Sequence, residues 1–168
     1  GGVTTVMDMP NTIPATTGAK EIKEKLALAR NRSSANIHFH IGATNSNHSN
    51  LAQIASQGCP EEGLKAEDIA GIKVFMGSST GNMLVNDDES LKELFSIKEK
   101  PILVHCEDED TIKRNLQAAK EKYGDDIPFE EHKNIRSRMA CIKSTIKALE
   151  LAMKYQTRLV LCHISTME

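Results

Sequence analysis

The sequence carries almost no excess charge of either sign, because its formal net charge at pH 7 is only −2. A chain so close to neutral offers no electrostatic basis for binding nucleic acid or an anionic membrane. Long apolar runs are also missing, since none approaches the roughly 20 residues that a membrane-spanning helix needs. No signal-peptide pattern stands at the N-terminus. We therefore expect a protein that binds neither nucleic acid nor membrane.

Cysteine is sparse and shows no pattern, because the four cysteines form no C-x-x-C pair and no disulfide-like ladder. Cys106 and Cys162 lie in apolar segments, where a free cysteine behaves as a small hydrophobe. These features favour a reducing, cytoplasmic setting. The alternative is that both cysteines bind zinc beside His105 and His163. It is disfavoured, because neighbouring residues of a strand point to opposite faces of the sheet.

The composition is ordinary for a globular protein, with 39% hydrophobic and 26% charged residues. A length of 168 residues suffices for one domain with a sizeable core. The chain starts with glycine rather than methionine, close to its first strand-like segment. We therefore expect a single, incomplete domain over residues 1–168, taken from the middle of a longer protein.

Strand-like and helix-like segments alternate along the whole chain. The expected strands are residues 3–9, 36–43, 71–77, 101–107 and 159–166, and the expected helices are residues 18–30, 50–56, 87–95, 112–124 and 134–155. Such alternation predicts parallel strands joined by crossover helices. Five strands fit either a flavodoxin-like open sheet or part of a (β/α)8 barrel, which typically needs about 250 residues. The spacing alone does not decide between them.

The last expected helix has one clear apolar stripe. Its members are Ile135, Met139, Ile142, Ile146, Leu149 and Met153. Apolar residues at this spacing are typical of the buried face of an amphipathic helix. We therefore expect this stripe to pack in the core.

Lys73 lies inside an apolar, β-branched run at residues 71–77 (GIKVFMG), which is typical of a fully buried parallel strand. A buried ammonium must be paired, neutralised or chemically modified, and desolvation favours the neutral amine. A neutral lysine can add carbon dioxide to become a carbamate, whose two oxygens can bridge two divalent metal ions. The alternative is a lysine at a strand end that extends its amine into solvent.

Two histidines occupy the corresponding end of later apolar runs, His105 in residues 101–107 (PILVHCE) and His163 in residues 159–166 (LVLCHIST). In parallel α/β folds, active sites are built at the carboxyl ends of the strands. A single strand histidine is usually a hydrogen-bonded core or rim residue. Two of them, after a lysine on the strand before, favour a metal site, and imidazole nitrogen suits zinc. The sequence thus predicts a metal-centred hydrolase.

Other patterns are weaker candidates for a site. His38-Phe39-His40 puts both rings on one strand face, but in the middle of a strand and away from the catalytic rim. Residues 77–82 (GSSTGN) lack the Walker lysine and spacing, so a loop that closes over a small substrate is the better interpretation. The acidic run at residues 107–110 (EDED) is interpreted as loop and helix-cap charge. His48 and His132 are expected in exposed loops.

Taken together, the motifs resemble those of dihydroorotases, in the cyclic amidohydrolase superfamily. The segments that carry the resemblance are residues 1–12 (GGVTTVMDMPNT), 72–76 (IKVFM), 104–108 (VHCED), 132–137 (H-x-x-I-R-S) and 162–166 (CHIST). They occur in the family's order and cover essentially the whole chain. The resemblance implies an α/β fold, a partial TIM (β/α)8 barrel with strands two to six of eight and their helices.

The resemblance also implies the metal site. Two zinc ions would be bridged by carboxylated Lys73 and bound by His105 and His163. The family's own H-x-H motif belongs on strand one, before this chain, whereas the His38-Phe39-His40 pair falls on strand three. The aspartate of strand eight, the proton shuttle, would follow Glu168. We therefore expect no catalytic residue of the family within this chain, and no activity of this segment alone.

Hydantoinases, dihydropyrimidinases and allantoinases share the barrel, the lysine and both histidines. Residues 9–12 (MPNT) and 105–108 (HCED) favour dihydroorotase, whose matching asparagine contacts the substrate carboxylate, so the resemblance assigns Asn11 to substrate binding. The implied activity is reversible conversion between dihydroorotate and N-carbamoyl-aspartate in pyrimidine biosynthesis, by a cytoplasmic homodimer acting on this small molecule. The alternatives are another cyclic amidohydrolase or a non-catalytic barrel homologue that acts as a scaffold.

Overall fold

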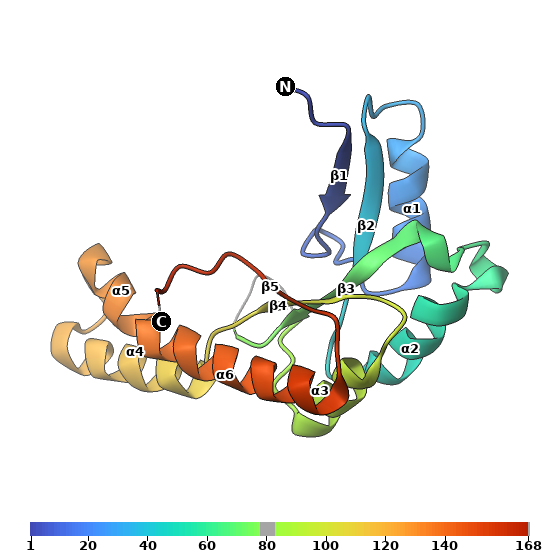
Figure 1. Ribbon diagram of the computed structural model, residues 1–168. Helices are drawn as coiled ribbons and strands as arrows, with labels where there is room; N and C mark the ends of the chain where they lie inside the picture. The colour runs from blue at the N-terminus through green and yellow to red at the C-terminus, as the bar shows by residue number, and fades with distance from the viewer. Residues whose placement is uncertain (78–82, 168) are drawn as a thin grey trace.

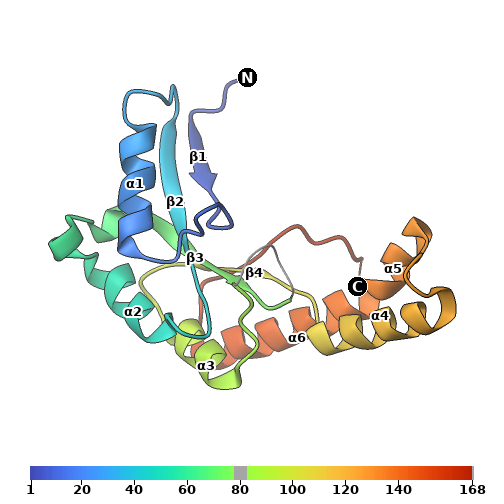
Figure 2. The same cartoon turned by 180° about the vertical axis from the view of Figure 1, so that it is seen from behind.

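A computed structural model describes residues 1–77 and 83–167, which form a parallel sheet with helices along its outer side (Figures 1 and 2). The strands are β1 (Thr5–Asp8), β2 (Asn36–Gly42), β3 (Ile69–Phe75), β4 (Ile102–His105) and β5 (Leu159–Leu161). The α-helices are α1 (Ala19–Ala29), α2 (His48–Gln57), α3 (Asp88–Ser96), α4 (Glu109–Tyr123), α5 (His132–Ile135) and α6 (Arg138–Tyr155). Short 3-10 helices cover Pro60–Glu62, Ala66–Asp68 and Phe129–Glu131. The alternation expected from the sequence is confirmed.

The order of the strands decides between the two architectures that the sequence left open. All neighbouring strands are parallel, and they follow one another as β1-β2-β3-β4-β5. A flavodoxin-like sheet reverses its strand order at a switch point, whereas a (β/α)8 barrel runs in sequence order. The sheet also bends, so that β1 and β2 stand upright in Figure 1 while β4 and β5 run nearly level. The fold is therefore part of a (β/α)8 barrel.

The alternating residues of the central strands separate the hydrophobic core from the candidate site. In β3, Ile72 and Val74 are fully buried and belong to the core that packs against the helices. Leu91 and Phe95 of α3 belong to the same core and are almost completely buried. Since successive side chains of a strand point to opposite faces, Lys73 faces the inner side of the sheet.

The two outer strands are more exposed than the central ones. The apolar run at residues 159–166 is built like that of β3, but the central residue of β5, Val160, is 44% exposed. At the other edge, Val6 of β1 is 40% exposed. Each of these strands has a hydrogen-bonded neighbour on one side only among the described residues, so each forms an edge of the sheet.

The prediction that the stripe of large apolar residues on the longest helix packs in the core is wrong. Met139, Ile146 and Met153 point away from the sheet and are 62%, 50% and 74% exposed. The face of α6 that packs inward is instead formed by Ala140, Ser144, and Ala148. The helix also begins later than expected, because the chain leaves helical geometry between α5 and α6, at residues 136–137. Small side chains let the helix axis approach the sheet closely, so they form the buried face although they are less hydrophobic.

No α-helix among the described residues is both long enough and apolar enough to cross a membrane. The loop at residues 77–82, interpreted above as a closing loop, lies almost wholly outside the described residues.

Candidate functional site

Three neighbouring strands bring the expected ligands to one end of the sheet. Lys73 lies in β3, and His105 is the last residue of β4, paired with Phe75 of β3. His163 follows β5 by two residues and has a φ of 38°, in the left-handed region that residues other than glycine rarely adopt. Such an outlier is often found at a functional site.

The side chain of Lys73 is buried. The residue is only 3% exposed, and its Nζ lies 4.9 Å from the ring centroid of Phe75, which faces the same side of the strand. An aromatic face attracts a cation at this distance and gives an uncharged amine an apolar surface to pack on. The alternative of a lysine that extends into solvent is therefore wrong.

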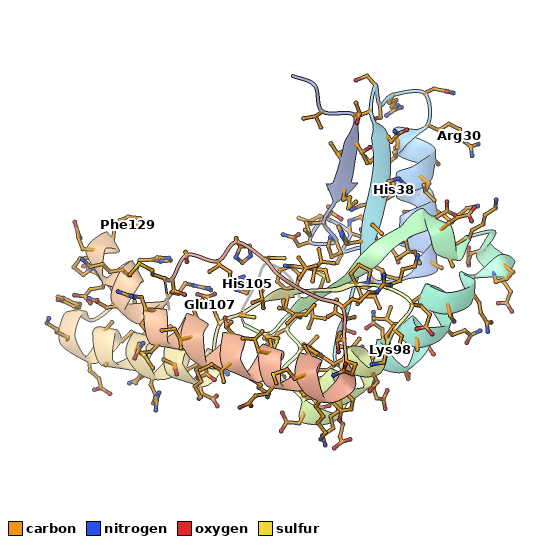
Figure 3. All side chains as sticks on the ribbon, viewed as in Figure 1. Arg30, His38, Lys98, His105, Glu107 and Phe129 are labelled. Carbon is orange, nitrogen blue, oxygen red and sulfur yellow. The ribbon has the colours of Figure 1, made fainter. Side chains whose placement is uncertain are left out.

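The two strand histidines face one another. Nδ1 of His105 lies 3.2 Å from Nε2 of His163, and their ring centroids are 4.9 Å apart. The second ring nitrogen of His105, Nε2, lies 2.7 Å from Oε2 of Glu107. The same carboxylate oxygen also accepts a hydrogen bond from Nη1 of Arg136. Figure 3 shows His105 and Glu107 close together.

The electrostatic surroundings shift the pKa values of two groups in this cluster. Burial and the neighbouring His105 lower the pKa of the His163 imidazole, which favours its neutral form. Burial alone would raise the pKa of the Glu107 carboxyl, but its hydrogen bond to His105 and the charge of Arg136 lower it overall. The cluster thus combines a neutral imidazole with an ionised carboxylate.

The geometry of the facing nitrogens fits a zinc site. Ligand nitrogens about 2.0–2.1 Å from a tetrahedral zinc lie about 3.3 Å from each other. The Nδ1 of His105 and the Nε2 of His163 are separated by 3.2 Å. Within residues 1–77 and 83–167, no group of three His, Cys, Asp or Glu side chains is arranged to hold a metal. Among the described residues, buried Lys73 is therefore the candidate for a further ligand.

An open pocket of about 140 Å³ lies beside the cluster. Its lining includes His105, Glu107, Arg136, Cys162 and His163. The pocket is therefore bounded by the end of β4, the break between α5 and α6, and the segment that follows β5.

Sequence reasoning missed the roles of Glu107 and Arg136. Glu107 was interpreted as loop charge, although an H-x-E pattern in an extended segment places both side chains on the same side. Arg136 lies 29 residues further along the chain, so its contact with Glu107 depends on how α5 and α6 meet. The remaining acidic residues behave as expected, since Asp108 caps α4 by accepting a hydrogen bond from the Thr111 N–H.

The other sequence candidates lie elsewhere. Nδ1 of His40 lies 3.1 Å from the carbonyl oxygen of Asp8, and burial lowers the pKa of this buried ring. His38 lies upstream in β2, well apart from His105 (Figure 3). His48 and His132, expected in loops, are instead the first residues of α2 and α5.

Asn11 and the cysteines complete the expected set. Asn11 follows β1 in an exposed loop, on the same carboxyl-end side of the sheet as Lys73. Cys106 is buried beside Ser144 of α6, and burial raises the pKa of its thiol to about 11. A thiol that stays protonated on the helix side of the strand behaves as a small hydrophobe, as expected.

Comparison with known proteins finds relatives along the whole chain, although no protein-family model matches it. The dihydroorotase of Methanosarcina acetivorans is 34% identical over an alignment of 171 positions, which covers 100% of this chain and 33% of that protein. The dihydroorotase of Methanosphaera stadtmanae is 32% identical, with 99% and 35% covered. An allantoinase of Arabidopsis thaliana is 32% identical over 122 residues, with 70% and 22% covered.

A solved structure shares the fold. The L-hydantoinase (dihydropyrimidinase) of Arthrobacter aurescens matches with a TM-score of 0.81 and 25% identity, over 98% of this chain and 35% of that one. The chain spans about a third of the length of the curated relatives that it matches, between 33% and 35% for the two dihydroorotases.

Proposed function

Because the chain belongs to the cyclic amidohydrolase superfamily and matches dihydroorotases along its whole length, we propose that the protein carrying it is a zinc-dependent dihydroorotase. The reaction would open and close the ring of dihydroorotate, with N-carbamoyl-aspartate as the other species. The observation that supports the proposal is that His105 and His163 face each other across 3.2 Å, with buried Lys73 on the neighbouring strand β3. A cytoplasmic homodimer remains an expectation from the resemblance.

Three residues of this chain would bind the metal ions. Lys73, as a carbamate formed when its neutral amine adds carbon dioxide and loses a proton, would bridge two zinc ions, and His105 and His163 would both bind the same one of these ions through nitrogen. Bound zinc lowers the pKa of a water molecule to about 7 and polarises a carbonyl oxygen. The burial of Lys73 and its place on the strand next to that of His105 support this role.

Asn11 would bind the carboxylate of the substrate through its amide N–H groups. Its side of the sheet and its exposed position support this role. Arg136 contributes charge to the pocket but already contacts Glu107, so it would act through that carboxylate. The pocket walls would keep a small cyclic amide beside the histidines.

The alternative is a related cyclic amidohydrolase, and the allantoinase and hydantoinase relatives keep this alternative open. A steady-state assay of the full-length protein with zinc, comparing dihydroorotate, hydantoin and allantoin, separates the candidates. We expect dihydroorotate to be the preferred substrate, because residues 9–12 (MPNT) resemble the dihydroorotase segment whose asparagine contacts the substrate carboxylate. Preference for another ring would retain the metal chemistry and discard the pyrimidine assignment.

The same assay includes Lys73→Ala, with Lys92→Ala as the matched control, since Lys92 forms an ion pair with Glu89 on the outer helix α3. Lys73→Ala is expected to abolish binding of two zinc ions and to lower kcat by orders of magnitude. Lys92→Ala is expected to retain both. Unchanged activity of Lys73→Ala would remove this residue from the site, and absence of turnover with every substrate would favour a non-catalytic scaffold.

A further inference from the structure

We propose that Glu107, held in place by Arg136, is a positioning residue that orients the His105 ring for metal binding. The inference rests on the proposed function, because it takes His105 as a metal ligand. It adds Glu107 and Arg136, which are not among the proposed metal ligands, to the site. It also gives a role to the carboxylate of Glu107, whose side chain is only 13% exposed.

The first step of the argument is the tautomer of His105. A neutral imidazole carries its proton on one nitrogen, and the hydrogen bond made by that nitrogen sets which one it is. Nε2 of His105 lies 2.7 Å from a carboxylate oxygen of Glu107, which can only accept. The proton is therefore on Nε2, and the lone pair of Nδ1 points toward Nε2 of His163, 3.2 Å away. This is the nitrogen pair whose separation fits zinc.

The second step is the arrangement that holds Glu107. Arg136 donates from Nη1 to Oε2 of Glu107, the same oxygen that accepts from His105. Arg136 can do so because the chain leaves helical geometry between α5 and α6, where its φ and ψ are −90° and 67°. Arginine remains charged under all ordinary conditions and forms strong hydrogen bonds to carboxylates. The break between these helices thus fixes the position of the carboxylate.

The third step is the backbone of Glu107, which is held by the end of β3. A Cβ added to Gly77 would lie 2.6 Å from the Cβ of Glu107 and 2.6 Å from its carbonyl oxygen. Only glycine therefore allows this approach of the chain after β3 to the chain after β4. The Glu107 side chain is fixed by α5–α6 and its main chain by the segment after β3, so its oxygen has little freedom to leave His105.

The test measures zinc binding in the full-length protein, without substrate, by competition with a chromogenic chelator. Removing an outer partner of a metal-binding histidine typically lowers metal affinity about 10- to 100-fold. We expect a loss of this size for Glu107→Ala. Glu107→Gln keeps an acceptor oxygen and is expected to recover part of the affinity. The matched control is Glu89→Gln, which removes an exposed carboxylate paired with Lys92.

Arg136→Ala distinguishes positioning from a general loss of charge. If Arg136 acts through Glu107, then Glu107→Ala combined with Arg136→Ala binds zinc no more weakly than Glu107→Ala alone. NMR spectroscopy with 15N-labelled histidine provides a second measurement. The metal-free wild type should show a protected Nε2–H proton of His105. That resonance is expected to vanish in Glu107→Ala, whereas a purely structural role would leave it in place.

The outcomes separate the two proposals. Wild-type protein that binds zinc, together with Glu107→Ala that binds it equally well, would overturn the positioning role and leave the proposed function standing. A proton found on Nδ1 of His105 would do the same. Wild-type protein that binds no zinc would overturn both. Additive losses in the double variant would show that Arg136 acts independently of Glu107, which contradicts the coupling proposed here.

Discussion

At the scale of single residues, Asn11 is an expected site residue that lies in a loop rather than in a strand. It lies between Pro10, which is buried, and Thr12. The carbonyl oxygen of Pro10 accepts hydrogen bonds from the backbone N–H groups of Thr12 and Thr16, at 2.8 and 2.9 Å. These bonds fold the loop back on itself directly after β1, so the position of Asn11 is defined although its side chain is exposed.

This position leads to a prediction about substrate selectivity. Asn11→Ala should lower kcat/KM for dihydroorotate by about 10- to 100-fold, because a hydrogen bond to a charged group contributes roughly 1.5–3 kcal/mol. The measurement is steady-state kinetics of the full-length protein. Hydantoin serves as an internal control, since it has no carboxylate and its turnover should change little. An equal loss for both rings would mean that Asn11 does not recognise the carboxylate.

The sequence alone could identify those site residues that stand out from their immediate neighbours in the chain. Lys73 stands out because a lysine interrupts an apolar strand, and its burial is confirmed. The contact between Glu107 and Arg136 has no local signal, because the two residues belong to segments 29 positions apart. Their meeting depends on where α5 ends and α6 begins, and that boundary was placed incorrectly.

At the scale of elements, the start of α4 is stabilised by Asp108. Its carboxylate accepts hydrogen bonds from the Thr111 N–H and hydroxyl, at 3.0 and 2.6 Å, and from Nζ of Lys143 in α6, at 2.9 Å. The backbone N–H of Asp108 donates to the carbonyl oxygen of Ala140, at 2.9 Å. One residue thus caps α4 and ties it to the start of α6, directly beside the candidate site.

Asp108→Ala is expected to lower the free energy of unfolding by about 1 kcal/mol at pH 7, as for the loss of other helix caps. Burial raises the pKa of this carboxyl, but the Thr111 and Lys143 hydrogen bonds lower it overall. A depressed pKa stabilises the fold above the unfolded value of about 3.9, and this stability is lost as the pH falls through the folded value. The difference between variant and wild type should therefore shrink in acid.

Urea unfolding at pH 7 and at a pH well below the unfolded value of about 3.9 measures both effects. Asp125→Ala is the control, because Asp125 is exposed in the loop after α4 and its loss should change stability by less than about 0.5 kcal/mol. A difference for Asp108→Ala that is the same at both pH values would show that the carboxylate charge contributes nothing to the cap.

The longest helix shows what periodicity cannot decide. Its sequence contains two candidate faces, one of large apolar residues such as Met139 and Met153, and one of small residues such as Ala140 and Ala148. Periodicity favours the more hydrophobic face, but the observed contact is made by the smaller one, whose Ala140 and Ala148 have no exposed surface. Close approach to the sheet is a property of the packed structure, so the pattern could predict the helix but not its orientation.

At the scale of the whole molecule, the parallel strands and their alternation with helices could be predicted from the sequence, whereas their order could not. Each strand is a local pattern, but the neighbour of each strand is set by how the crossover connections pack. The order β1-β2-β3-β4-β5 and the bend of the sheet identify the barrel. They also leave β1 and β5 as edges within the described chain, with exposed residues such as Val6 and Val160.

These edges predict the behaviour of residues 1–168 expressed alone. Unpaired strand edges are templates for pairing with other chains, and exposed apolar surface adds to this tendency. Met139, Ile146 and Met153 of α6 supply such a surface, with 62%, 50% and 74% exposure. We therefore expect the isolated segment to self-associate at micromolar concentration and to show no zinc-dependent turnover, because its site would rest on Lys73 and two histidines.

Size-exclusion chromatography with light scattering measures the association, and the dihydroorotate assay measures turnover. Ile146→Lys combined with Met153→Lys should reduce the association of the segment while leaving its circular dichroism unchanged, since both side chains point away from the sheet. The control is Glu150→Lys, which adds positive charge at an already polar position of α6. It should reduce the association of the segment less. A monodisperse monomer would show that neither the strand edges nor the exposed face of α6 promotes self-association. Zinc-dependent turnover by the segment would show that five strands are enough to build the site.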